Sequence, residues 1–400
     1  MIMFVQYYLG IGSQDMINTL FKTPYRLFFL LGTIALFVGL IIWILPLIDD
    51  QLYFGRMHAH YMIGIFLLSF VIGFLMTAIP RMSNSRPASH KEMLLQLMPM
   101  LFAAFFGLYQ INERPFFFCF VIALVILFRF AAVRIIKAPQ VIPDVFPMVL
   151  VGLFSGLAGA LFNFFDYTEI GNRLFYLNFV LALCVGIGAR LLPMIMNVKC
   201  SYSAKTSEFL LIGILLTLAC FIEVYVSENF GNAIRAMTMT AVFFRHWKAH
   251  LFEGPTSSVA WGLRFAAFSM LFGSIGLWLF PSFRLEALHI IYVSGFGLLT
   301  IMVASRVILA HGNHDLKLEF GNWFIKIPMT LIILAGVTRV SAAFLPAVYE
   351  QHLAYAAISF LSGCLLWSYF FLPKLLDLDF EKSDPVCETV ASFHSHDKEQ

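Results

Sequence analysis

The sequence predicts an all-α protein, a polytopic bundle of about twelve transmembrane helices. Three observations lead to this fold class. Hydrophobic residues make up 60% of the chain and charged residues only 12%, whereas about a quarter of the residues in soluble domains are charged. The mean hydropathy is +0.85. Apolar runs of the length that a bilayer core requires, about 20 residues, follow one another along most of the chain.

Short polar segments separate these runs and divide the chain into its predicted spans. A helical bundle held by the bilayer is one cooperative body, so residues 1–380 are predicted to form a single transmembrane domain. Residues 381–400 are polar and are predicted to form a disordered cytoplasmic tail. The spans are expected at about 27–48, 59–80, 94–112, 115–136, 145–165, 174–196, 207–226, 230–245, 258–281, 287–309, 322–345 and 351–373.

The distribution of basic residues predicts the orientation of these spans. Lys and Arg are concentrated in short cytoplasmic loops of membrane proteins. With twelve spans, most Lys and Arg outside the spans fall on one side, and that side also holds both termini. The other side holds only Arg56, Arg114, Arg173 and Arg284. The chain is therefore expected to have its N- and C-termini inside the cell.

Charge and cysteine usage exclude several classes of function. The net charge of +3 is small and dispersed, which does not indicate a nucleic-acid partner. The six cysteines form no CxxC pair, so a disulfide framework is not expected. There is also no CxxCH sequence, and any haem would therefore be bound non-covalently. The expected environment is the lipid bilayer.

Three histidines are predicted to lie near the outer membrane surface. His58 and His60 stand where the second span begins, and His289 stands where the tenth begins. Imidazole is a good ligand for haem iron and copper, and ionisable groups at membrane depth are functional candidates. On a helix, His58 and His60 point about 200° apart, so only one of them is expected to face a shared centre, and we favour His60. Interfacial histidines bonded to headgroups or loop carbonyls are the alternative.

Two further histidine pairs are expected on the cytoplasmic side. Their spacings, i,i+4 and i,i+3, place each pair on one helical face. Each pair is compatible with a metal site or with ordinary loop histidines. The pairs are His246 with His250 and His311 with His314.

Arginines within or beside the predicted spans need a carboxylate, a backbone carbonyl or an anionic ligand group as partner. Haem propionates are such groups. Arg190 and Arg306 are expected toward the inner ends of the sixth and tenth spans, whereas Arg56 and Arg284 flank the outer histidines. Snorkelling to the membrane surface is the alternative for each.

Several segments together resemble the NnrS family of bacterial haem- and copper-containing membrane proteins. The resemblance covers almost the whole chain. Its segments are Tyr25-Arg26-Leu27-Phe28-Phe29, Met57-His58-Ala59-His60-Tyr61-Met62, Gly73-Phe74-Leu75-Met76-Thr77-Ala78-Ile79-Pro80, Gly188-Ala189-Arg190-Leu191-Leu192-Pro193, Ala287-Leu288-His289 and Ala304-Ser305-Arg306-Val307-Ile308-Leu309-Ala310-His311-Gly312.

The resemblance implies a multi-pass protein of the bacterial inner membrane that takes part in the response to nitric oxide and nitrosative stress. It implies haem b as cofactor, with copper as a second candidate. The twelve helices are similar in number to the catalytic subunit of haem-copper oxidases. By this resemblance His60 and His289 are haem or copper ligands. His311 is a further candidate metal ligand, and His58, Arg306 and Arg190 are further candidate cofactor-binding residues.

The chain departs from the family pattern at two positions of interest. Tyr61 stands where a glutamate usually follows the second histidine, and Arg264 stands where the ninth helix usually carries a histidine. The missing histidine implies that one metal ligand is lost in this member and that its metal content, copper in particular, is altered.

Three classes of function remain open on the sequence. The first is a haem-binding membrane protein that responds to nitric oxide, and the second is a transporter or channel without a redox cofactor. The third is a structural or assembly subunit whose histidines have no special role. No sequence feature identifies a proton path, an electron donor or a redox partner. Whether the protein is an enzyme is therefore left open.

Overall fold

The computed structural model describes residues 13–45, 55–108, 112–138, 143–199, 205–253 and 256–376. All regular secondary structure in these residues is helical, which confirms the predicted fold class. Ten helical stretches are long and apolar enough to cross a membrane, so the protein is a multi-pass membrane protein. These stretches are Pro24–Ile41, Gly55–Met82, Arg114–Ile136, Phe146–Phe164, Thr168–Ile195, Thr206–Tyr225, Ser258–Leu279, Pro281–His311, Leu316–Phe344 and Pro346–Leu375.

Two of the twelve predicted spans are helices that do not meet this criterion. The third corresponds to α6 (His90–Gly107) and the eighth to α12 (Glu228–Val242). The count of twelve and the orientation of the termini therefore stay predictions. The predicted cytoplasmic tail, residues 381–400, lies outside the described residues.

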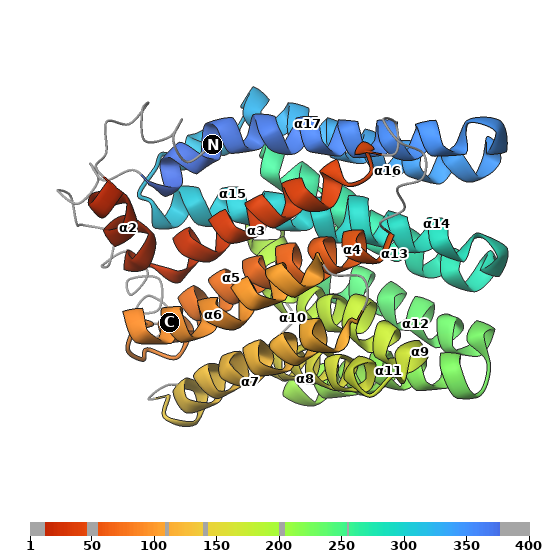
Figure 1. Ribbon diagram of the computed structural model, residues 1–400, viewed down its shortest axis with the longest axis horizontal. Helices are drawn as coiled ribbons and strands as arrows, with labels where there is room; N and C mark the ends of the chain where they lie inside the picture. Colours follow the sequence, from red (N-terminus) through yellow and green to blue (C-terminus); the bar gives the residue numbers. More distant parts are fainter. Residues whose placement is uncertain are drawn as a thin grey trace, which may run out of the picture.

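The long helices run side by side in the bundle, roughly along its long axis (Figure 1). Contacts join α3 to α5, α8 to α10, α11 to α12 and α16 to α17. Contacts also join α3 to α17, so the first and last long helices meet. The bounds not yet given are α3 (Pro24–Ile41), α5 (Leu68–Met82), α7 (Arg114–Ile136), α8 (Phe146–Phe164), α10 (Phe179–Ile195), α11 (Thr206–Tyr225), α13 (Ser258–Leu279), α15 (Leu298–His311), α16 (Trp323–Ser341) and α17 (Tyr349–Leu375).

Short helices distinguish the two ends of the bundle. At the right-hand end of Figure 1 lie α4 (Gly55–Ala59), α9 (Thr168–Asn172) and α14 (Arg284–His289). We call this the site end. Helix α2 (Ser13–Lys22) lies at the other end. The predicted topology assigns the site end to the outer membrane surface.

A stripe of glycines on α8 lets its neighbours approach closely. Gly152, Gly156 and Gly159 recur at helical spacing and face the segment that begins at Arg173 and continues into α10. A Cβ added at Gly159 would lie 2.5 Å from the backbone nitrogen of Phe175. Small residues of this kind commonly mark close helix contacts in membranes. The stripe thereby fixes the position of a segment that contributes to the candidate site.

Gly159→Ala is expected to lower the free energy of unfolding by about 1–3 kcal/mol, because an overpacked contact against backbone cannot relax easily. Thermal unfolding of the detergent-purified protein measures this. Gly107→Ala is the matched control, since its Cβ would meet Phe116 and Tyr61 at an ordinary 3.4 Å. Equal melting temperatures for the two variants would contradict the close contact.

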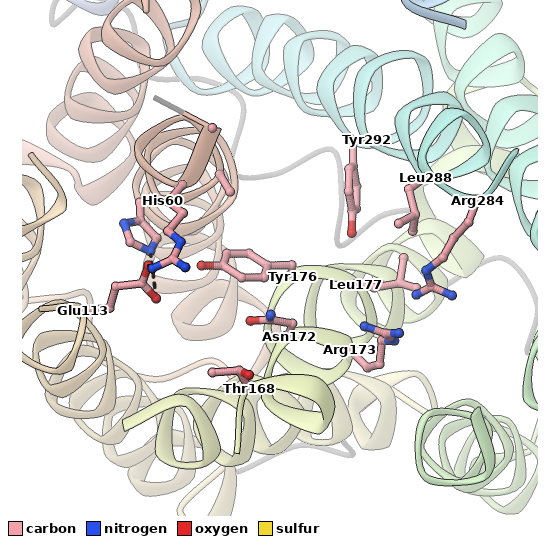
Figure 2. Close-up of a pocket in the computed structure, with 13 residues that line it drawn as sticks. His60, Glu113, Thr168, Asn172, Arg173, Tyr176, Leu177, Arg284, Leu288 and Tyr292 are labelled. Atoms are coloured by element: carbon pink, nitrogen blue, oxygen red, sulfur yellow. Dashed lines mark hydrogen bonds and ion pairs between the residues drawn. The ribbon is translucent and has the colours of Figure 1, made fainter. Parts of the chain in front are cut away.

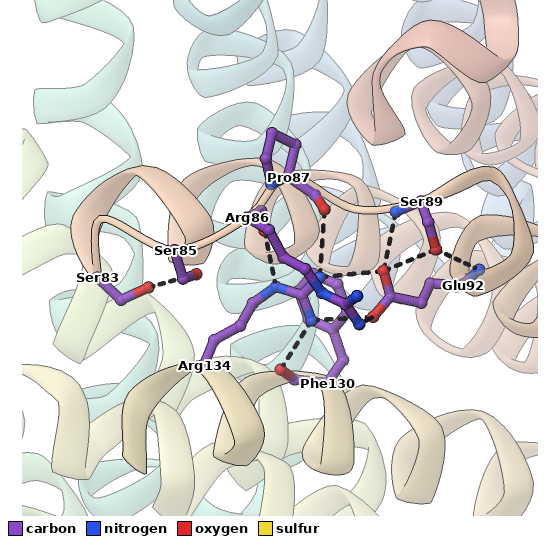
Figure 3. A network of polar contacts seen from close by, with 8 residues as sticks. All are labelled: Ser83, Ser85, Arg86, Pro87, Ser89, Glu92, Phe130 and Arg134. Carbon is purple, nitrogen blue, oxygen red and sulfur yellow. Dashed lines mark hydrogen bonds and ion pairs between the residues drawn. The ribbon is translucent and has the colours of Figure 1, made fainter. Parts of the chain in front are cut away.

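A buried arginine ties the start of α6 to α7 at the end opposite the site. Both Nη atoms of Arg134 donate to the carboxylate of Glu92, at 3.1 and 3.0 Å, and Nε donates to the carbonyl of Arg86 at 3.2 Å (Figure 3). Ser89 caps α6 by accepting from the Glu92 backbone, and Glu92 accepts from the Ser89 backbone. Burial opposes ionisation, but the hydrogen bonds from Arg134 and Ser89 hold the pKa of the Glu92 carboxyl below its usual range.

Candidate functional site

Three π-helical segments converge on the site end. They are η2 (His60–Leu67), η3 (Arg173–Asn178) and η6 (Ile290–Gly297), and each follows directly on α4, α9 or α14. The fourth described π-helical segment, η4 (Phe243–Trp247), follows α12. π-Helical turns are rare and occur frequently at functional sites. Three of them beside one another mark this end of the bundle as the candidate site.

A cavity of about 460 Å³ lies among these segments (Figure 2). This volume falls within the range of ligand pockets. Its rim carries the exposed side chains of Arg56 and Thr168. The lining residues are Gly55, Arg56, Ala59, His60, Glu113, Thr168, Asn172, Arg173, Tyr176, Leu177, Arg284, Leu288 and Tyr292.

One end of the cavity holds a buried histidine beside a carboxylate. His60 Nε2 lies 4.0 Å from Glu113 Oε2, and the imidazole stacks on the ring of Phe116 with centroids 3.9 Å apart. The backbone of Gly107, at the end of α6, also lies beside the imidazole. Arg56 Nη1 donates to Glu113 at 3.3 Å. His60 is therefore engaged by α6 and by the start of α7.

The other end of the cavity holds two arginines that share a buried carboxylate. Arg173 Nε lies 2.6 Å, and Arg284 Nη2 2.7 Å, from Glu223 Oε1. Arg235, behind them and fully buried, donates to Glu223 Oε2 at 2.6 Å. Arg284 also pairs with Glu228, whose side chain is 47% exposed. The guanidinium groups of Arg173 and Arg284 lie near each other in Figure 2, across the cavity from His60.

His58 and His289 lie outside this cavity and share another environment. His58 Nδ1 donates to the carbonyl of Gly39 at 2.8 Å, and His289 Nδ1 donates to that of Leu285 at 2.7 Å. A carbonyl only accepts, so both protons sit on Nδ1 and each Nε2 keeps its lone pair. Neither Nε2 has a hydrogen-bond partner within the described ranges. The two rings interact electrostatically with each other, and both interact with Arg339.

Arg339 is buried and incompletely paired. Its Nη1 lies 3.9 Å from Glu286 and has no hydrogen-bond partner in the part of the chain that is described. A buried guanidinium in this state favours an anionic partner, because an uncompensated charge is costly in low dielectric. The structure thus brings together two imidazoles with available Nε2 atoms and one arginine with an available donor.

His58 and His60 face different neighbours: His58 bonds to Gly39 in α3, and His60 packs on Phe116 and Phe117 of α7. On the sequence, His60 was the favoured ligand on this helix. That preference stays a prediction, but the ring with an available Nε2 beside His289 is His58.

The other predicted site residues lie away from the site end. His311 ends α15, roughly 30 Å along the same helical stretch from His289, and contacts Arg81 and Tyr25. Arg306 pairs with Glu319 at 2.9 Å. Arg190 is exposed, without an ion-pair partner among the described residues. The structure therefore does not bring these three residues to His60 and His289.

The two histidine pairs that were predicted on the cytoplasmic side have separate partners. His246 Nε2 lies 3.3 Å from Glu208, and the His250 ring contacts Phe244. His314 Nε2 lies 3.4 Å from the carbonyl of Lys374. No group of three or more His, Cys, Asp or Glu side chains is placed to hold a metal ion within the described residues.

Arg264, which stands where a ninth-helix histidine was expected, is buried. Its Nη2 donates to the carbonyl of Leu251 at 2.6 Å, and its guanidinium lies 4.5 Å from the centroid of the Phe252 ring. The residue is thus accommodated as a packed cation in α13.

Sequence reasoning missed part of the site. Glu223, Tyr176 and Tyr292 were not singled out. A carboxylate inside the seventh predicted span was the available signal for Glu223, since such groups are rare at membrane depth. The tyrosines gave no signal, because isolated aromatic residues are common in membrane helices.

A family model described as NnrS protein matches residues 19–378, which is most of the chain. No curated protein matches it.

Proposed function

Because this chain belongs to the NnrS family, we propose that it is a bacterial inner-membrane protein that binds haem b and acts in the response to nitric oxide. Family membership fits a nitric-oxide-response membrane protein. The multi-pass helices fit a bilayer environment. The haem, its ligands and nitric oxide as the small-molecule partner are the parts that we propose.

The observation that carries the haem proposal is the state of His58 and His289. Histidines that bind a metal almost always donate their other ring nitrogen to a backbone carbonyl or carboxylate, which fixes the tautomer. Both rings have this arrangement, at 2.8 and 2.7 Å. His58 and His289 would hold the iron through Nε2, and Arg339 would take a propionate. Histidine-held haem iron binds diatomic ligands or transfers electrons.

Haem fits these residues better than copper does. Two imidazoles suffice for a haem iron, whose other ligands come from the porphyrin. A copper site built only from protein needs more ligands, and the described residues contain no group of three His, Cys, Asp or Glu side chains for it. Copper therefore remains the second candidate cofactor.

His58→Ala and His289→Ala are each expected to lower haem occupancy at least tenfold, about the loss that follows from removing a partner of a metal ligand. The measurement is the reduced-minus-oxidised visible spectrum of the detergent-purified protein, with metal analysis. His60→Ala tests the sequence-based choice, and His311→Ala, at the opposite end, is the control that keeps the spectrum.

A colourless wild-type protein, folded and expressed with haem supplied, would overturn the proposal. The transporter or channel alternative would then lead. A spectrum lost in His60→Ala and kept in His58→Ala would move the iron to the cavity and restore the sequence-based assignment.

A further inference from the structure

We propose that the cavity between Arg173, Arg284 and Tyr292 binds a small planar oxyanion of the carboxylate, nitrite or nitrate class. This site differs from the His58, His289 and Arg339 group, to which the haem proposal refers. It is argued from the charges and donors that line the cavity, and it does not depend on haem binding.

The first argument is the charge of the buried cluster. Three guanidinium groups, from Arg173, Arg235 and Arg284, surround the single buried carboxylate of Glu223. The cluster therefore carries an excess of two positive charges. Glu228 offsets part of this excess, through Arg284 alone and from a half-exposed position. In a low-dielectric interior the remaining excess favours the entry of an anion.

The second argument is the unused donors of Arg173. Its Nε is taken by Glu223, but its two Nη groups have no hydrogen-bond partner in the described part of the chain. The Arg173 side chain is 27% exposed and lines the cavity. A planar guanidinium with a free edge matches a planar oxyanion with two hydrogen bonds. This geometry favours carboxylate, nitrite or nitrate over a spherical halide.

The third argument is the hydroxyl of Tyr292. Tyr292 lines the cavity from η6 and its hydroxyl points into the cavity, whereas the hydroxyl of Tyr176, from η3, points toward His60 and Glu113 in Figure 2. The Tyr292 hydroxyl has no hydrogen-bond partner within the described ranges. A phenolic hydroxyl is a donor to an anion. The amide of Asn172 lies on the same wall and offers two more donors.

The lining also determines where in the cavity the anion sits and how large it is. Glu113, at the far end beside His60, repels an anion, and Tyr176 lies between Glu113 and the arginines in Figure 2. Leu177 and Leu288 supply apolar wall beside the arginines. Apolar wall cannot replace the hydration shell of sulfate or phosphate. A weakly hydrated, planar, singly charged ion fits best.

The test is thermal unfolding of the full chain in detergent, titrated with sodium nitrite, nitrate or acetate. Sodium sulfate at matched ionic strength is the reference, because it separates specific binding from screening. Wild type is expected to gain melting temperature with a dissociation constant on the order of 1 mM, a value compatible with a ligand of so few atoms.

Two variants assign the effect to the cavity. Tyr292→Phe removes one hydroxyl and nothing else, and it is expected to weaken binding about tenfold, as loss of a hydrogen bond to a charged group does. Arg173→Lys keeps the charge but removes the planar edge, with a similar loss expected. Arg114→Gln is the control, since that exposed arginine lies at the same end and pairs with Asp166 outside the cavity.

Performing the titration with and without haem incorporated identifies the source of the oxyanion. A shift in both preparations supports a site for free anions. A melting-temperature shift in the haem-free protein alone supports the same oxyanion chemistry, because it means that the carboxylates of the haem occupy the site when haem is bound. No shift beyond that in sulfate, or equal shifts in wild type, Tyr292→Phe and Arg173→Lys, would overturn the proposal whatever the haem spectrum shows.

Discussion

Glu223→Gln is expected to lower the free energy of unfolding by about 3–5 kcal/mol, the usual cost of leaving buried charges without their partner. The substitution keeps the shape of the side chain and removes its charge. Three arginines would then face one another with only the half-exposed Glu228 as counter-charge, because Glu223 bonds to Arg173, Arg235 and Arg284. This loss is a large part of the stability of an ordinary domain.

Thermal unfolding and size-exclusion profiles of the detergent-purified variant measure the loss. Glu228→Gln is the matched control, since it removes a carboxylate from the same cluster at a half-exposed position. Exposed pairs contribute about 0–1 kcal/mol, so the control should melt close to wild type. If the Glu223→Gln protein were as stable as its control, water and ions would have to compensate the charge of the three arginines, and the predicted cost would be wrong. Added nitrate should partly restore the stability of Glu223→Gln if the cavity binds oxyanions as proposed.

Arg134→Ala is expected to cost about 3 kcal/mol, because it strands the carboxylate of Glu92 and three backbone carbonyls. Arg134→Lys should recover only part of this, since an ammonium cannot make two parallel hydrogen bonds to one carboxylate. The damage is expected where the start of α6 contacts the end of α7, which is away from the cavity. Haem content per folded protein should therefore stay unchanged.

Arg86→Ala provides the comparison for this pair. Arg86 lies 3.6 Å from the same carboxylate but is 77% exposed, so its loss should shift the melting temperature little. Thermal unfolding of the three variants side by side measures the difference. If Arg86→Ala lowered the melting temperature as much as Arg134→Ala does, this would contradict the special role given to the buried guanidinium.

The fold class, and the place of His58, His60 and His289 near the ends of two long helical stretches, could be predicted from the sequence. The apolar run at 59–80 became the stretch Gly55–Met82, and the run at 287–309 became Pro281–His311. Hydropathy suffices for this, because a bilayer requires spans of a set length. Arg56 and Arg284 were also expected beside the outer histidines, and both line the cavity there.

The partners of the charged residues could not be predicted. Glu223 bonds to Arg173 and Arg284, each at least fifty residues away, and periodicity within one helix carries no information about such pairs. The choice between His58 and His60 likewise needed a neighbouring helix, because the carbonyl that orients His58 belongs to Gly39 in α3. The start of α6 was missed by four residues, although Ser89 and Glu92 form a recognisable capping box.

The π-helical segments that begin at His60, Arg173 and Ile290, here called the wide turns, have a consequence for the parts of their helical stretches that lie beyond them, away from the site end. A π-helical turn holds one residue more than an α-helical turn, so it behaves as a one-residue insertion accommodated within a continuous helix. Deleting that residue would restore an α-helix and rotate everything beyond it by about 100° relative to the residues before it. The wide turns thus determine how each cavity-lining segment is rotated about the helix axis relative to the helix that anchors it in the bundle. Consider a relative that lacks one residue within 60–67, 173–178 or 290–297. If its anchoring helix packed in the bundle as here, its site residues would point away from the cavity.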